Sequence, residues 1–286
     1  MRALICVFSG TGNTRRVAER LSEELNIYGV ETDVFPIRAG CDVPETADYD
    51  MLILGYPVHA FNAPAALLRF AKKLPKAEGM PAYIIRSSGE PLRLNDASGI
   101  TPGRILKKRG YVLRGECAYV MPYNIIFRHS DGMAARMWRA AELRIKEDAK
   151  RIAQGMEIKC KVNVFRRFVP FVLRIEHTAM PILGHHFRAT EKCVGCGICA
   201  NLCPEGNIKM VDGKPKFAKS CVGCMACAFG CPKDAMKISV LNGWRVNGKN
   251  SFAGEPATDE EVCSYCKKAY LRYFHESENN ADSRLK

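Results

Sequence analysis

The cysteines of this chain are the feature that most constrains its fold. Eight of the fourteen fall in two runs of the form C-x2-C-x2-C-x3-C-P, and each member of the second run lies twenty-eight residues after its counterpart. This spacing is typical of a segment that binds two 4Fe-4S clusters. A disulfide framework or zinc sites are the alternatives, but zinc normally takes two separated pairs of ligands. The eight cysteines are Cys193, Cys196, Cys199, Cys203, Cys221, Cys224, Cys227 and Cys231.

A cubane cluster explains why the fourth cysteine of each run is set apart from the first three. Three thiolates from one tight loop can bind three irons, and the fourth iron takes the remote cysteine of the other run. The glycines between the cysteines keep side chains away from the cluster and leave backbone N–H groups free to bond to sulfides. The predicted ligand sets are Cys193, Cys196, Cys199 with Cys231, and Cys221, Cys224, Cys227 with Cys203.

The repeat extends beyond the cysteines, with Gly195 and Gly223, and also Ala200 and Ala228, at matching positions. On these residues the segment resembles the bacterial two-cluster ferredoxins. The resemblance implies a small α+β ferredoxin domain over residues 188–241.

The chain opens with a pattern of strand, glycine-rich loop and helix. Residues 2–8 are an apolar run, residues 9–14 spell SGTGNT, and apolar residues then follow at helical spacing. Such a loop directs backbone N–H groups at an anion, and the helix N-terminus adds its dipole. An ordinary turn is the alternative, since the loop has neither the lysine of a nucleoside-triphosphate loop nor the pattern of dinucleotide folds. The predicted anion-binding residues are Ser9, Gly10, Thr11, Gly12, Asn13 and Thr14.

Strands and helices alternate over residues 1–157, which we take as the first domain. Five strands separated by helices predict a doubly wound parallel sheet, whose ligands bind beyond the carboxyl ends of the strands. The expected strands cover 2–8, 31–37, 51–55, 81–86 and 111–122, and the expected later helices cover 63–73, 96–109 and 131–154.

The SGTGNT loop resembles the FMN phosphate loop of flavodoxins. This resemblance implies the strand order 2-1-3-4-5, bound FMN, and flavin contacts from the loops after the third and fourth strands. Tyr56 or Phe61 is expected to stack on the flavin, and His59 either couples flavin reduction to protonation or is simply solvated. The loop after the fourth strand has no aromatic residue through Ser98, so a second stacking partner is not identified. The expected contacts are Tyr56, Pro57, Val58, His59, Phe61, Asn62, Ser87, Ser88 and Gly89.

Residues 158–187 are expected to form a connector and residues 242–286 a C-terminal extension that contains a helix. In the connector, Phe165, Phe168, Val169, Val172 and Leu173 follow helical spacing, which predicts an apolar face that packs the two domains together. A helix at a membrane surface is the alternative.

The C-terminal extension carries two further cysteines. A capping pattern that starts at Thr258 predicts a helix with Cys263 and Cys266 on one face. They are packing residues, a modest dithiol, or part of a metal or redox site with Cys160.

The charge and the apolar content of the chain limit the partners and the location that we expect for it. The formal net charge is +13, and two oxidised clusters at roughly −2 each would offset about four positive charges. The remaining excess is suited to an acidic redox partner, although a solvated surface is the plain alternative. No stretch is long and apolar enough for a membrane span and no signal peptide precedes the first strand, so we expect a cytoplasmic protein.

Nearly the whole chain resembles the flavodoxin–ferredoxin fusion proteins of anaerobic bacteria and archaea. The resemblance implies electron transfer between FMN and two 4Fe-4S clusters, and between soluble redox partners, with no residue assigned as catalytic. A flavoenzyme that reduces a small molecule is the first alternative, and an iron-sulfur sensor or nucleic-acid-binding regulator is the second. We expect no nucleic-acid partner, because no recognition element accompanies the basic charge.

Overall fold

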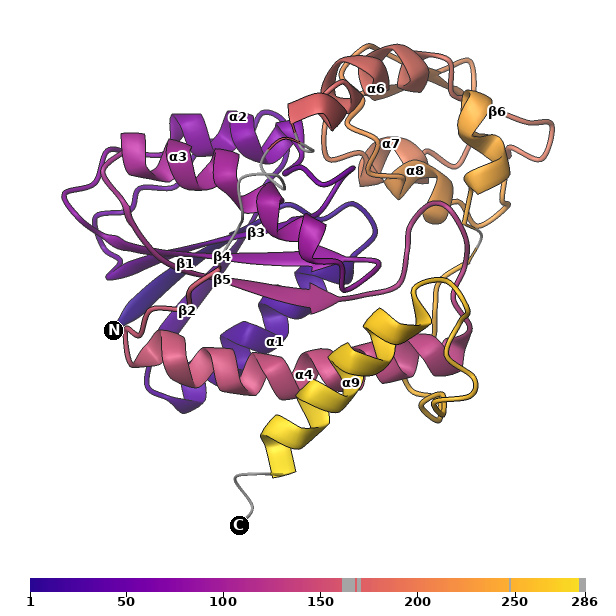
Figure 1. The fold of residues 1–286 in the computed structure, drawn as a ribbon. Coiled ribbons are helices and arrows are strands. Elements are labelled where there is room, and N and C mark those ends of the chain that lie inside the picture. The colour runs from indigo at the N-terminus through magenta and orange to yellow at the C-terminus, as the bar shows by residue number, and fades with distance from the viewer. Residues whose placement is uncertain (161–167, 169–170, 247, 283–286) are drawn as a thin grey trace.

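The computed structural model describes residues 1–160, 168, 171–246 and 248–282. Its first part is a five-stranded parallel sheet of order β2-β1-β3-β4-β5, as Figure 1 shows, which confirms the expected doubly wound topology. The strands are β1 Arg2–Val7, β2 Glu31–Pro36, β3 Met51–Pro57, β4 Pro81–Ser88 and β5 Val112–Val120.

Helices cover both faces of this sheet (Figure 1). Alternate residues of each strand point to opposite faces, so Leu52 and Leu54 pack toward α2, while Ile53 packs toward α1 and α4. The helices are α1 Asn13–Ile27, α2 Ala65–Lys73, α3 Ile100–Lys108 and α4 Asp131–Ala153. The expected helix over 96–109 begins instead as a 3-10 helix, η1 Arg93–Gly99, that leads into α3.

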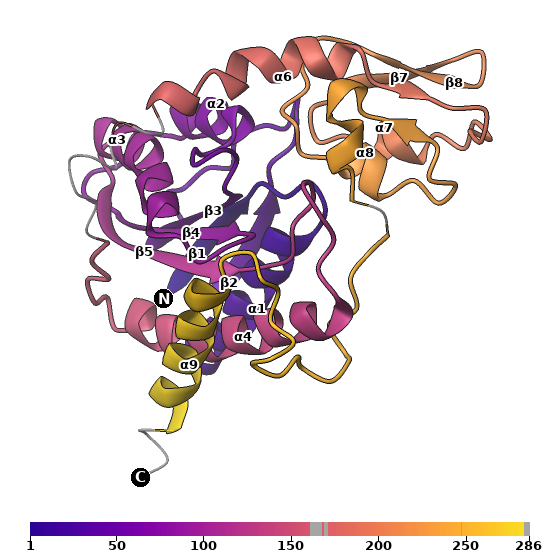
Figure 2. The same ribbon diagram turned by 45° about the vertical axis from the view of Figure 1, so that its right-hand side comes forward.

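The second part is a small domain whose halves interlock. Strand β6 Arg188–Ala189 pairs with β9 Met236–Lys237, so the two ends of the cysteine-rich segment lie together. Between them, β7 Ile208–Val211 and β8 Lys214–Phe217 form the hairpin seen in Figure 2. The helices are α6 Glu176–His185, α7 Ile198–Leu202 and α8 Ala226–Phe229, and the 3-10 helix η2 covers Ser239–Trp244.

The C-terminal extension returns to the sheet domain. Helix α9 Lys267–Asp282 packs against α4, and Tyr270 and Phe274 are fully buried there. Figures 1 and 2 both show α9 alongside α4, far from the hairpin. The expected helical placement of Cys263 and Cys266 is wrong, because residues 258–266 form turns and the helix begins at Lys267. The side chain of Glu261 still accepts the Thr258 N–H at 2.7 Å, as in a capping box.

The connector differs from its expected role where the structure describes it. Phe168 and Val172 are 69% and 61% exposed, so these two side chains do not pack between the domains as expected, whereas Leu173 is half-buried. Phe165 and Val169 lie outside the described residues. Throughout the described part of the chain, no helix is both long enough and apolar enough to cross a membrane.

Candidate cofactor sites

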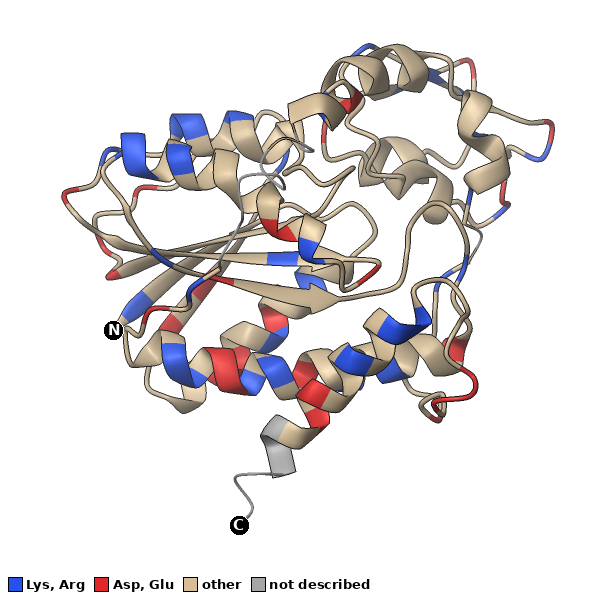
Figure 3. Ribbon diagram, viewed as in Figure 1, with Lys and Arg blue, Asp and Glu red and all other residues tan. Residues whose placement is uncertain are grey.

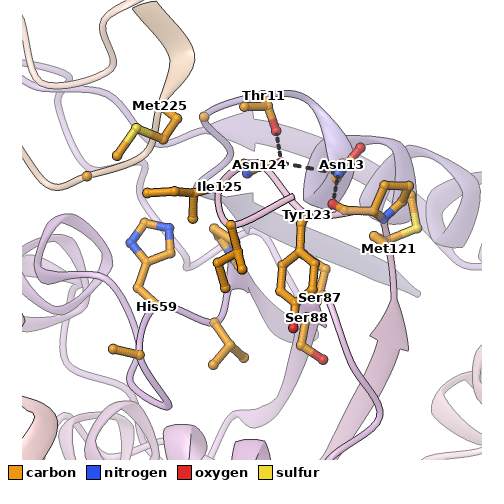
Figure 4. Close-up of a pocket in the computed structure, with 18 of the residues that line it drawn as sticks. Thr11, Asn13, His59, Ser87, Ser88, Met121, Tyr123, Asn124, Ile125 and Met225 are labelled. Atoms are coloured by element: carbon orange, nitrogen blue, oxygen red, sulfur yellow. Dashed lines mark hydrogen bonds between the residues drawn. The ribbon is translucent and has the colours of Figure 1, made fainter. Parts of the chain in front are cut away.

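A cavity of about 400 Å³ lies at the carboxyl ends of β1, β3, β4 and β5 (Figure 4). This is the edge at which doubly wound sheets bind their ligands. Four loops of the sheet domain line it, and they lie within residues 9–14, 57–61, 87–90 and 121–126.

The glycine-rich loop has free donors at the mouth of this cavity. The backbone N–H groups of residues 10–14 have no acceptor within the described chain, and Gly12 adopts φ +100° before the first turn of α1. Thr11 Oγ1 donates to Asn124 Oδ1 at 2.7 Å, and Asn13 Nδ2 donates to the Pro122 carbonyl at 2.8 Å, as Figure 4 shows. Consecutive unpaired N–H groups at a helix N-terminus fit a phosphate.

Most of the expected contacts beyond this loop line the cavity, and two do not. Tyr56 is wrong as a stacking residue, because it is fully buried against the α2 face of the sheet and its hydroxyl pairs with Ser98. Asn62 is also buried outside the lining and closes a turn by pairing with the backbone of His59. The expected residues that do line the cavity are Pro57, Val58, His59, Phe61, Ser87, Ser88 and Gly89.

Aromatic side chains reach the cavity from segments that the sequence did not single out. Tyr123, in the loop after β5, lies directly against Gly89, so that a Cβ there would come within 2.1 Å of its ring. Trp244 and Tyr265 approach from the C-terminal part of the chain. Tyr123 could have been predicted to line the cavity, because its loop follows a parallel strand at the ligand-binding edge of the sheet. No local sequence pattern marks Trp244 or Tyr265.

The small domain forms the opposite wall of the cavity. Gly223 and Met225, which flank Cys224, both line it, and Figure 4 shows Met225 at the edge of the pocket. Gly10 lies so close to this loop that a Cβ would come within 2.5 Å of the Cys224 carbonyl oxygen. The Ala39 N–H donates to the Pro204 carbonyl at 2.6 Å, and Arg69 pairs with Glu205. The anion-binding loop and one cysteine loop are therefore in direct contact.

The folding of the small domain brings the two cysteine runs together. One small cavity is lined by Cys193, Cys196 and Cys199 and also by the remote Cys231. Burial is the largest cause that raises the pKa of Cys224. The nearby thiols of Cys227, Cys221 and Cys203 raise it further. Among the described residues, no three His, Cys, Asp or Glu side chains converge on a single metal ion. Ligands of a cubane bind separate irons, so the arrangement suits a cluster rather than one ion.

Comparison with known proteins assigns the cysteine-rich segment to a family. Residues 192–236 match the family described as "4Fe-4S dicluster domain". The chain joins a flavodoxin-like domain to a 4Fe-4S dicluster domain. No curated protein matches the chain.

Solved structures similar to the chain include flavodoxins. The flavodoxin of Streptococcus pneumonia is 18% identical, with 54% of this chain and 99% of that chain covered and a TM-score of 0.42. Flavodoxin 1 from Bacillus cereus is 18% identical, with coverage of 54% and 96% and a TM-score of 0.38. An NAD(P)H:quinone oxidoreductase from Methanothermobacter marburgensis is 16% identical, with coverage of 53% and 96% and a TM-score of 0.39. The fold assignment rests on the strand order itself.

A histidine and a carboxylate face each other where the flavodoxin-like domain meets α6. His59 Nδ1 lies 3.7 Å from Glu176 Oε1, and Glu176 Oε2 is buried with no hydrogen-bond partner among the described residues. Both residues line the main cavity and also a second hollow of about 330 Å³ beside Cys221. Burial raises the pKa of Glu176 to about 7, whereas burial first and His177 second lower the pKa of His59 to about 4. The pair can hold a proton beside the cavity near neutral pH.

Replacing Glu176 by glutamine should change how stability depends on pH. Between its ordinary pKa of 4.5 and about 7, the folded protein keeps a proton on Glu176 that the unfolded chain releases. The free energy of unfolding therefore decreases by about 1–3 kcal/mol as pH rises through this interval. Glu176→Gln removes this loss, so the variant should gain stability relative to the natural chain at pH 8 but not at pH 5.

Thermal unfolding midpoints at the two pH values would check this result. Glu45→Gln, which replaces an exposed carboxylate, is the matched control and should show no such difference. An equal effect of Glu176→Gln at both pH values would contradict the burial of an ionisable Glu176.

Cys160, the expected third member of a site with Cys263 and Cys266, lies beside Arg86. Arg86 Nη2 is 3.5 Å from the Cys160 sulfur, and Arg86 is in an ion-pair network with Asp96 and Glu116. A site that combines Cys160 with Cys263 and Cys266 is therefore wrong.

Proposed function

We propose that this chain is an electron carrier that passes electrons between FMN and two 4Fe-4S clusters, and between soluble redox proteins. The observation that carries the proposal is the shared wall: Gly223 and Met225, on either side of Cys224, line the cavity that also contains the glycine-rich loop. This packing supports a short separation between the proposed redox centres. FMN, when bound, supplies exchange of electrons singly or in pairs, whereas each cluster passes one at a time.

The residues around the cavity fit FMN in three respects. The unpaired N–H groups of residues 10–14 would hold the phosphate, assisted by Thr11 and Asn13. The apolar and aromatic wall, which includes Phe61 and Tyr123, would pack against the flavin ring. The dicluster domain covers the other side, which would limit the access of water to a reduced cofactor.

The cluster ligands are proposed as the two crossed sets of cysteines. Cys231 would complete the set of Cys193, Cys196 and Cys199, with which it lines one cavity. Cys203 would complete the set of Cys221, Cys224 and Cys227, which lies beside the flavin cavity. The second cluster is then the one placed to exchange electrons with the flavin.

The charge distribution supports docking of a partner with an acidic surface. Helices α2 and α3 lie side by side, and both end in lysines: Lys72 and Lys73 in α2, and Lys107 and Lys108 in α3. Figure 3 shows these basic residues gathered on the outer side of that layer. A positive surface of this kind speeds association with an acidic partner and loses this effect as salt increases.

Anaerobic purification followed by iron, sulfide and flavin quantification on one sample tests the proposal. We expect about eight irons and one FMN per chain, with an optical spectrum that bleaches on reduction by dithionite. Eight irons without flavin after reconstitution with FMN would restrict the function to a ferredoxin with an additional docking domain. Fewer than about four irons after reconstitution would contradict the proposal as a whole.

A further inference from the structure

Two cysteines outside the cluster motifs lie beside the flavin cavity. Cys263 and Cys266 are separated by two residues, both are half-buried, and both are free thiols. Tyr265, between them in the chain, lines the cavity itself. Burial first, and Cys266 second, raise the pKa of Cys263.

The second of these cysteines begins a long helix. The Cys266 carbonyl accepts the N–H groups of Ala269 and Tyr270 at 2.8 and 3.1 Å, at the start of the sixteen-residue helix α9. The N-terminus of a helix favours negative charge, and C-x-x-C pairs at such ends are a common setting for reactive thiols. Cys263 Sγ donates to the Tyr265 carbonyl at 3.4 Å, which holds it on the preceding turn.

Two tyrosines and a buried carboxyl group lie on the side of the cavity next to this pair. Tyr123 donates its hydroxyl hydrogen to Glu90 Oε2. Burial is the largest cause that raises the pKa of Tyr265; the nearby Tyr123 hydroxyl lowers this pKa, whereas the Cys266 thiol raises it. Burial also raises the pKa of Glu90. Tyr123, Tyr265 and Glu90 all line the cavity next to the cysteine pair.

A metal site does not account for the pair. Within the described residues no third His, Cys, Asp or Glu joins two others closely enough to hold a metal ion. Two thiols alone supply half the ligands of a structural zinc site. The remaining chemistry that two neighbouring thiols share is reversible oxidation to a disulfide.

We propose that Cys263 and Cys266 are a redox-active dithiol that reduces disulfide bonds. The Cys266 thiolate attacks one sulfur of a disulfide R–S–S–R′, which forms a mixed disulfide and releases R′S⁻ to take up a proton. Cys263 then attacks the Cys266 sulfur, which forms the Cys263–Cys266 disulfide and releases the second thiol, RSH. One disulfide is thus reduced to two thiols while the protein dithiol is oxidised.

Restoring the dithiol requires two electrons and two protons. The electron relay proposed above would supply the electrons from low-potential iron-sulfur donors, and in this respect the inference rests on the proposed function. The position of Tyr265 in the cavity wall places the pair next to that relay. The disulfide exchange itself uses only the side chains of this chain.

Mass spectrometry of the anaerobically purified full chain tests the proposal, with oxidised glutathione as the probe. Both cysteines fall in one tryptic peptide, residues 250–267, so a disulfide between them leaves this peptide two hydrogens lighter and closed to alkylation. In the natural chain we expect this closed form after exposure to oxidised glutathione, and its return to the open form with excess reduced glutathione. Cys263→Ser should trap glutathione on Cys266, and Cys266→Ser should slow adduct formation at least tenfold.

Cys41→Ser is the matched control, because it removes a half-buried thiol outside the motifs and should leave the peptide chemistry unchanged. The proposal would be overturned if both cysteines were alkylated at all glutathione ratios, or if the two serine variants formed adducts equally. Iron and flavin are counted on the same samples. A normal thiol response in a protein without flavin would therefore refute the proposed relay and leave the dithiol intact.

Discussion

Replacing Cys231 by alanine should remove the cluster held by the first run of cysteines, although Cys231 belongs to the second. The iron content should fall from about eight to about four per chain, because one of two cubanes loses a ligand. The reason is structural: Cys231 lines the same small cavity as Cys193, Cys196 and Cys199.

The double variant Cys193→Ala with Cys231→Ala sharpens this test. If both residues serve one cluster, the double variant should lose no more iron than either single variant, as expected for two members of one unit. If each run held its own cluster, the double variant would lose nearly all of its iron. Cys41→Ala, outside both runs, is the control and should keep about eight irons.

Replacing Gly12 by alanine should weaken FMN binding by about tenfold or more. Gly12 has φ +100°, which costs an L-residue roughly 1–3 kcal/mol, and the loop can relieve this strain only by turning its N–H groups. A hydrogen bond to a charged group is worth about 1.5–3 kcal/mol, and 1.4 kcal/mol is a factor of ten in the dissociation constant. Fluorescence titration of the reconstituted apoprotein with FMN measures the change.

Gly29→Ala provides the matched control at the other end of the same helix. Gly29 also has a positive φ, +73°, and a Cβ at either glycine would meet nothing within 4 Å. The two substitutions should therefore cost similar stability, while only Gly12→Ala should affect FMN. Equal FMN affinities in the two variants would show that the loop over residues 9–14 does not hold the phosphate.

The core position of Tyr56 could have been predicted from the sequence. Leu52, Leu54 and Tyr56 share one face of β3, and the first two are core residues. The alternation of side chains along a strand therefore assigns Tyr56 to the core. Tyr123 could likewise have been chosen, because it follows β5 at the ligand edge of the sheet.

Other features depend on contacts between segments far apart in the chain. Glu176 meets His59, and Tyr265 meets Tyr123, only because the dicluster domain and the C-terminal extension fold back onto the flavodoxin-like domain. Neither pair has a spacing or a local pattern that marks it. Burial then sets the directions of their pKa shifts, and burial is a property of the assembled structure.

The sequence by itself determined the two cluster motifs, the parallel sheet and the glycine-rich loop. Each of these can be recognised from spacings of a few residues, because the geometry of a cluster loop, a strand or a helix start is local. Only the tertiary structure brings Gly10 against Cys224 and places Met225 and Tyr265, the latter between Cys263 and Cys266, in the cavity wall. These contacts arise from the packing of one domain on another, which no local spacing encodes.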